Sequence, residues 1–201
     1  MKKILPVFSY IFHPLFISVY AGLFYFTLFH DFYVIEEIYL FLIQIVIIMV
    51  LIPISMFYLL LSLGKIDSIM AEELSQRKIP LLINCILLFI LTQKSVTSDR
   101  IPELHYFFVG GMFSSILAFL FLLLKKKASL HMLGIVALTF FVIGVSLHIE
   151  ISLLYTIAAC ILLIGFVGSS RLAMKAHTLS ELTLGFVCGA LPQIFFWPFW
   201  L

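Results

Sequence analysis

Charged side chains are scarce in this sequence of 201 residues, of which Asp, Glu, Lys and Arg together make up 11%. A water-soluble domain carries about a quarter of its residues as charged side chains, so the composition excludes that class. The chain is 64% hydrophobic, and its apolar segments are unbroken, whereas the strands of an outer-membrane barrel alternate between apolar and polar residues. The sequence therefore predicts an all-α, polytopic transmembrane helical bundle.

Cysteine is also rare, and its distribution argues against two further kinds of site. Cys85, Cys160 and Cys188 stand singly in apolar segments and form no CxxC pair. We interpret them as small core residues and not as metal ligands or disulfide partners. The sequence has no internal repeat, no low-complexity tract and no soluble domain. We expect one integral membrane domain over residues 1–201, with no cofactor and no nucleic-acid partner.

Seven apolar segments approach the roughly 20 residues that a helix needs to cross a bilayer, and they predict six to seven spanning helices. The segments are 5–29, 35–63, 79–95, 103–124, 128–147, 150–169 and 178–200. The first is too long for the hydrophobic region of a signal peptide, so we expect it to be the first spanning helix. Pro14, after His13, and Pro53 are expected to kink their helices.

Four small or polar residues inside the apolar segments indicate how the helices pack. Asn84 and Gln193 are expected to form hydrogen bonds between helices or to line a cavity. Gly185 and Gly189 are four residues apart and are expected to allow close helix packing.

Basic residues are distributed unevenly between the two sides of this predicted bundle. With the N-terminus inside, Lys94 and Arg100 are the only two of the 12 Lys and Arg residues that fall outside. Cytoplasmic connections carry such an excess, so we expect a cytoplasmic N-terminus, in a bacterial inner membrane. The inner segments 64–80, 125–131 and 169–181 then converge on one membrane face. Within them, the triplet Lys125 to Lys127 is interpreted as an interfacial anchor.

The segment 169–181 is a polar island between the last two apolar segments. It places Arg171, Lys175, His177 and Glu181 within about three helical turns. His177 and Glu181 are four residues apart, so on a helix they would share a face and form a hydrogen bond. A histidine with a carboxylate behind it and cations beside it is typical of a nucleophile or base that acts on an anionic substrate. An ordinary membrane-boundary loop is the alternative for this segment taken alone.

The three inner segments together resemble the motifs of the type 2 phosphatidic acid phosphatase superfamily, over about residues 65–190. They read Gln76-Arg77-Lys78-Ile79-Pro80, then Lys127-Ala128-Ser129-Leu130-His131, then Ser170-Arg171-x5-His177-x3-Glu181. The family's motifs run Lys-x6-Arg-Pro, Pro-Ser-Gly-His and Ser-Arg-x5-His-x3-Asp. The third motif matches in spacing throughout, with a glutamate in place of the aspartate.

The first two motifs depart from the family's pattern. In the second motif, Ala128 replaces proline and Leu130 replaces glycine. The leucine adds a side chain where the backbone should approach the phosphate closely. In the first motif, Met70 occupies the place of the lysine, for which Lys78 and Lys127 are the candidate substitutes.

The resemblance implies a metal-independent phosphomonoesterase that acts on an amphiphilic lipid phosphate, such as phosphatidate, phosphatidylglycerol phosphate or a polyprenyl diphosphate. His177 would attack phosphorus and form a phosphohistidine, with Glu181 orienting its imidazole. His131 would protonate the leaving oxygen. The phosphate oxygens would be held by a set of polar residues from all three motifs: Arg77, Lys78, Ser129, Ser170 and Arg171.

Two other functional classes stay open at this point. His131, His177 and Glu181 could bind a divalent metal in a metal-dependent lipid enzyme or transporter, although no HExxH or Asp-rich motif accompanies them. Alternatively, the protein binds or moves a phospholipid or polyprenyl phosphate without cleaving it. The sequence leaves the oligomeric state open.

Overall fold

The computed structural model describes residues 5–66 and 74–201, and all regular structure within these ranges is helical. The predicted all-α class is therefore confirmed. The α-helices in the described ranges are α1 (Leu5–Ile11), α2 (Pro14–Leu28), α3 (Ile35–Val46), α4 (Ile52–Ser62), α5 (Lys78–Lys94), α6 (Pro102–Leu123), α7 (Leu130–His148), α8 (Leu154–Ala173) and α9 (Leu179–Phe196). Short helical turns accompany them: η1 (His30–Phe32), η2 (Ile47–Leu51), η3 (Ser75–Arg77) and η4 (Trp197–Phe199).

Five helical segments of the described chain are long and apolar enough to cross a membrane, or six if α1 and α2 form one bent span. They are α3 to α4 taken as one segment, α6, α7, α8, and α9 with η4. α5 has 17 residues, and at 1.5 Å per residue its length of about 26 Å falls short of a hydrocarbon core of ~30 Å. The count with the bent pair meets the lower end of the predicted six to seven.

The two prolines that were expected to kink their helices, Pro14 and Pro53, each coincide with a break in regular α-helix. α1 and α2 meet at an angle of 67°, and Pro14 is the first residue of α2, where its missing N–H leaves no hydrogen bond unmade. Between α3 and α4, the π-helical turn η2 ends two residues before Pro53. Such a turn accommodates a disturbed hydrogen-bond ladder without ending the helix.

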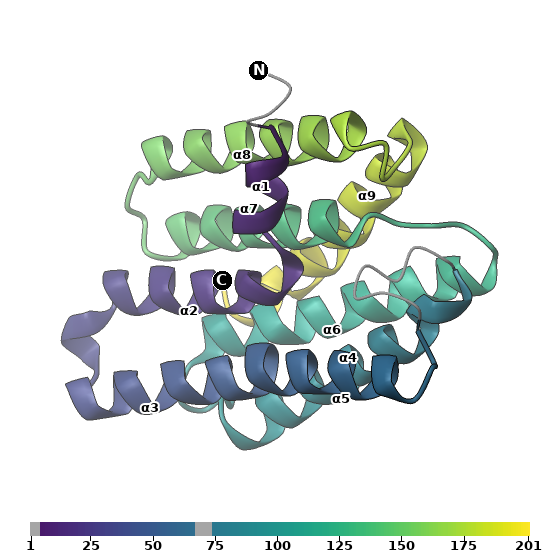
Figure 1. The fold of residues 1–201 in the computed structure, drawn as a ribbon. Coiled ribbons are helices and arrows are strands. Elements are labelled where there is room, and N and C mark those ends of the chain that lie inside the picture. The colour runs from purple at the N-terminus through teal and green to yellow at the C-terminus, as the bar shows by residue number, and fades with distance from the viewer. Residues whose placement is uncertain (1–4, 67–73) are drawn as a thin grey trace.

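The connections between the helices lie at two opposite ends of the bundle (Figure 1). The α6–α7 and α8–α9 connections and the start of α5 lie at one end, on the right of Figure 1, whereas the α2–α3 and α7–α8 connections lie on the left. We call the first of these the polar end, because it holds the three motif segments. Figure 1 also shows α1 crossing the direction of α8, on which it packs with the Phe8 ring stacked against that of Phe166 at 4.6 Å.

Two glycines allow α9 to approach the first turns of α7 closely. A Cβ atom at Gly185 would lie 2.5 Å from the carbonyl oxygen of Ser129, and one at Gly189 would lie 2.4 Å from that of Leu133. Neither position has room for a side chain, which confirms the packing role predicted for both glycines. The close approach lets the N–H of Ser129 donate to the carbonyl oxygen of Glu181 at 3.1 Å. The second and third motifs are therefore joined by a backbone hydrogen bond.

The two amide side chains inside apolar segments bridge helices, as predicted. Asn84 Nδ2 of α5 donates to Ser115 Oγ of α6 at 2.9 Å, and Gln193 Nε2 of α9 donates to the carbonyl oxygen of Phe107 of α6 at 3.0 Å. In a lipid environment such bonds satisfy polar groups that would otherwise have no partner.

A second polar cluster, which the sequence analysis did not identify, lies away from the polar end. Glu103 is buried at the start of α6 and accepts a hydrogen bond from the Tyr25 hydroxyl at 2.9 Å. Its other oxygen lies 3.2 Å from Nε2 of His148. This one carboxylate therefore links α2, α6 and α7.

Candidate functional site

A cavity of about 390 Å³ lies between α2, α4, α5, α6 and α7. Two arginines and three histidines form part of its wall: His13, Arg77, His131, Arg171 and His177. They come from the break between α1 and α2, from η3, from the start of α7, and from the end of α8 and the connection after it. The fold thus brings groups from all three motifs to one cavity, together with one histidine from outside them.

His177 and Glu181 form the pair that their spacing predicts. Nδ1 of His177 lies 2.7 Å from Oε2 of Glu181. An ionised carboxylate only accepts hydrogen bonds, so Nδ1 carries the proton and Nε2 keeps its lone pair. The pair does not share a helix face as expected, because α9 begins only at Leu179 and His177 precedes its N-cap, Thr178. Glu181 forms a capping box with Thr178, and the hydrogen bond from the Thr178 N–H to its carboxylate holds that carboxylate in place.

The surroundings of His177 favour its neutral form. Its side chain is buried, and this burial is the largest cause that lowers the pKa of His177 to about 4. The hydrogen bond to Glu181 opposes the shift, whereas the positive charges of Lys127, Arg171 and Arg77 add to it. At neutral pH the imidazole is therefore unprotonated at Nε2, which is the state that a nucleophile or general base requires.

Arg171 is a buried cation without a carboxylate partner among the described residues. The residue is 7% exposed, and its Nε has no hydrogen-bond partner among the described residues. None of the ion pairs in the described chain includes it, and its Nη1 contacts the sulfur of Met174 at 4.0 Å. An uncompensated buried charge is strongly unfavourable, so this part of the cavity wall favours an anion.

His131 is held by the N-terminal helix. Its Nε2 lies 3.2 Å from the carbonyl oxygen of Ser9. Because a carbonyl oxygen only accepts, Nε2 is the donor and Nδ1 is the unprotonated nitrogen of the neutral ring. The hydroxyl of the same Ser9 lies 2.6 Å from that of Ser170, so α1 links the second and third motifs. The ring of His13 stands perpendicular to that of His131, at a centroid distance of 5.0 Å.

The other three predicted phosphate ligands are not among the residues that line the cavity. Ser129 is fully buried as the N-cap of α7, where its hydroxyl accepts the N–H of Met132 at 3.5 Å. The hydroxyl of Ser170 is engaged by Ser9. Lys78 is exposed at the start of α5. These three residues therefore lie around the cavity and do not form its wall.

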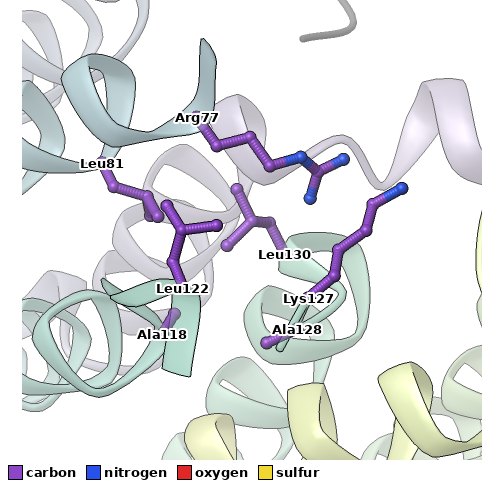
Figure 2. Close-up of a pocket in the computed structure, with 7 residues that line it drawn as sticks. All are labelled: Arg77, Leu81, Ala118, Leu122, Lys127, Ala128 and Leu130. Atoms are coloured by element: carbon purple, nitrogen blue, oxygen red, sulfur yellow. The ribbon is translucent and has the colours of Figure 1, made fainter. Parts of the chain in front are cut away.

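Lys127 contacts the third motif segment, a role that its interpretation as part of an interfacial anchor did not include. Its Nζ donates to the carbonyl oxygen of Ala176 at 3.3 Å, directly before the third-motif histidine. Figure 2 shows its side chain extending on the same side as that of Arg77, with Leu130 between their bases. These residues line a second, very small cavity of about 10 Å³. Met70, which takes the place of the family's lysine, lies outside the described residues.

His13 and Lys127 are the two site residues to which sequence reasoning gave no primary role. Lys127 had a usable signal, since it directly precedes the second motif. The only sequence signal for His13 was its position before Pro14 inside an apolar segment. A kink was expected there, but residue spacing does not predict that a bend of 67° turns this histidine towards the cavity.

Within the part of the chain that the structure describes, no three His, Cys, Asp or Glu side chains gather closely enough to hold a metal ion. The metal-dependent alternative therefore has no ligand cluster there.

Comparisons of the chain with protein-family models, with curated proteins and with solved structures find no match.

Proposed function

We propose that the protein is an integral membrane lipid phosphatase that cleaves an amphiphilic lipid phosphate through a phosphohistidine intermediate. One observation carries the proposal: Arg77, His131, Arg171 and His177, from three separate motif segments, line a single cavity. Phosphoryl transfer depends mainly on positioning and on stabilisation of negative charge. Two arginines supply the charge, and a neutral histidine backed by a carboxylate supplies the nucleophile.

The first chemical step forms the phosphohistidine. Nε2 of His177 attacks phosphorus, the bond between phosphorus and the lipid oxygen breaks, and the proton on Nδ1 of His131 passes to that oxygen. His131 takes this proton from solvent when the phosphate dianion binds, because a negative charge beside the imidazole favours its protonated form. Glu181 stabilises the positive ring of His177, while Arg77 and Arg171 bind the non-bridging oxygens.

The second step returns the enzyme to its starting state. Nδ1 of His131, now unprotonated, takes a proton from water as the water oxygen attacks phosphorus. The bond between phosphorus and Nε2 of His177 breaks. Inorganic phosphate leaves, and His131 releases the proton on Nδ1 to solvent, which restores its neutral ring. The α7 N-terminus, which begins at Leu130 beside the cavity, favours the anion in both steps.

We further propose that the polar end faces the cytoplasm of a bacterial cell, with the protein in the inner membrane. The uneven distribution of basic residues supports this orientation. A site at this level meets lipid headgroups, which suits a substrate with a phosphate head and a hydrocarbon tail.

The test is phosphate release by the purified protein from a panel of lipid phosphates, with and without EDTA. We expect release that resists EDTA, that is lost in His177→Ala and that persists in His30→Ala. His30 is the matched control because it lies exposed in η1, at the opposite end of the bundle. Release that EDTA abolishes would contradict the proposal and indicate a metal-dependent enzyme.

A binding protein without turnover is the second candidate, and Leu130 favours it. Its side chain lines both cavities at the position where the family's pattern has glycine. In this case the purified protein would retain a lipid phosphate and release none from the whole panel.

A further inference from the structure

His13 lines the cavity but belongs to none of the three motifs. It lies at the 67° bend between α1 and α2, inside the first apolar segment of the chain. An ionisable side chain within a membrane-spanning segment is unfavourable and marks a candidate functional site. The steps proposed for His131 and His177 give this histidine no part, so its role is open.

The ring of His13 is oriented by the helix that it caps. As the N-cap of α2, its Nδ1 accepts a hydrogen bond from the N–H of Leu15 at 3.3 Å. A ring nitrogen that accepts keeps its lone pair, so the proton of the neutral ring is on Nε2. Among the described residues, nothing accepts a hydrogen bond from Nε2, which leaves this N–H for a ligand.

The neighbours of His13 are residues to which the proposed function assigns the phosphate. Its ring stands perpendicular to that of His131, at 5.0 Å between the ring centroids. At this separation both rings can reach oxygens of one phosphoryl group, because each hydrogen bond spans about 3 Å. The positive charge of Arg171 also acts on both rings, so this guanidinium is their common neighbour.

Several groups that could have bound the phosphate are committed elsewhere. The hydroxyls of Ser129 and Ser170 bond to other parts of the protein, and neither residue lines the cavity. Asn84 and Ser115 do line it, but the Asn84 amide donates to the Ser115 hydroxyl at 2.9 Å. A phosphoryl group in this cavity therefore lacks the serine donors that the second and third motifs were expected to supply.

We infer that His13 is a further substrate-binding residue, whose Nε2–H donates to an oxygen of the phosphoryl group beside Arg171 and His131. This inference rests on the proposed function for the identity of the anion as a phosphate. The competing explanation is that His13 only caps α2. That role does not require a histidine, because Asn, Asp and Ser are the preferred N-cap residues.

Two amide substitutions separate these roles, because each reproduces one of the two ring nitrogens. In His13→Asn, the short side chain still accepts the N–H of Leu15 and caps α2, but nothing replaces the donor at Nε2. In His13→Gln, the longer side chain carries an amide N–H near the position of Nε2 and loses the cap. His30→Asn is the matched control, since His30 is exposed in η1 at the opposite end of the bundle.

The experiment measures kcat/KM for a lipid phosphate and for a small water-soluble phosphomonoester, together with the unfolding midpoint in detergent. We expect His13→Asn to lower kcat/KM for both substrates by about ten- to hundredfold, as the loss of a hydrogen bond to a charged group does, with an unchanged midpoint. His13→Gln should keep most of the activity and lower the midpoint. His30→Asn should change neither measurement.

The opposite pattern would show that His13 is only a cap: full activity in His13→Asn, with activity and midpoint both lowered in His13→Gln. Activity retained in both variants, an equal loss in both, or a loss confined to the lipid substrate would also overturn the bond from Nε2 to the phosphoryl group. Each of these outcomes leaves the phosphatase standing.

Failure of the proposed function gives a different result. If the unmodified protein releases phosphate from no substrate, titration with inorganic phosphate decides. Binding that His13→Asn weakens by about tenfold or more and that His13→Gln retains would keep His13 as an anion ligand and overturn the phosphatase. Binding that neither variant changes, or no binding at all, would overturn both.

Discussion

His177 is the residue whose protonation should control activity. Burial lowers its pKa to about 4, so the ring loses its nucleophilic lone pair only below that pH. We expect the acid limb of the pH profile of kcat/KM to lie near pH 4, with about a tenfold fall per pH unit below it. An ordinary exposed histidine would place the limb near pH 6.5, and such a profile would contradict the assignment.

Lys127 allows the cause of this shift to be tested. Its charge lowers the pKa of His177, so Lys127→Met should move the acid limb of kcat/KM to higher pH, whatever it does to the rate. Lys94→Met is the matched control, because Lys94 ends α5 far along the helix from the motif segment at its start. A limb that stays in place in Lys127→Met, or that moves equally in both variants, would show that this cation does not act on His177.

Motif spacing predicted the contact between His177 and Glu181 and grouped Arg77 and Arg171 with it, because these side chains stand at fixed intervals in the motifs. It could not predict how the serines are used. Ser129 is a strong N-cap residue and starts α7, while Ser170 has a partner 161 positions away in Ser9. A hydroxyl that suits a phosphate equally suits a helix terminus or another hydroxyl, so spacing alone does not separate these roles.

The short helix α1 connects the second and third motifs through Ser9. Ser9→Ala removes the hydroxyl bond to Ser170 and should lower stability by about 1 kcal/mol. A displaced α1 also loosens its hold on His131, so we expect kcat to fall about tenfold with little change in KM. Ser55→Ala is the control, since the Ser55 hydroxyl is exposed and bonds only within its own helical segment.

A double-mutant cycle separates this role from phosphate binding. If Ser170 acts only through Ser9, then Ser170→Ala and the double variant should match the loss in Ser9→Ala. Losses in kcat/KM that add, with KM raised in Ser170→Ala, would instead assign the Ser170 hydroxyl to the substrate.

The close packing of α9 on α7 should be sensitive to a single methyl group. Gly185→Ala would place Cβ 2.5 Å from the Ser129 carbonyl oxygen, and overpacking of this kind destabilises by about 1–3 kcal/mol. We expect a lower unfolding midpoint in detergent, together with lost activity, because the Ser129–Glu181 backbone bond would open. Gly165→Ala, where no atom lies within 4 Å of the new Cβ, should leave both measurements unchanged. Equal effects in the two variants would contradict the packing argument.

Hydropathy predicted the helical elements well, since long apolar segments have one stable form in a bilayer. It also predicted the short α5, since the apolar segment 79–95 differs from Lys78–Lys94 by one residue at each end. It did not predict the way α1 crosses α8, because this crossing depends on neighbouring helices and not on apolar length. The cluster around Glu103 was missed for a similar reason. Its tyrosine partner lies 78 positions away, and no local pattern links residues so distant in sequence.

The whole molecule separates two kinds of polar chemistry between its ends. One end carries the cavity with its arginines and a histidine kept neutral. Towards the other end, Glu103 is enclosed by Tyr25 and His148 and joins helices without lining this cavity.

The orientation of these two ends gives the last prediction, at the scale of the molecule in its membrane. Single cysteines at exposed positions, Ser98→Cys between α5 and α6 and Lys126→Cys between α6 and α7, report on opposite ends. They are introduced into a chain whose three native cysteines are replaced by alanine, with activity as the check on folding. In intact cells without an outer-membrane barrier, a membrane-impermeant maleimide should label position 98 but not position 126. Permeabilised cells should be labelled at both. Labelling of position 126 alone in intact cells would reverse the orientation and place the site outside, because the positive charges near the cavity would then serve the substrate and not the topology.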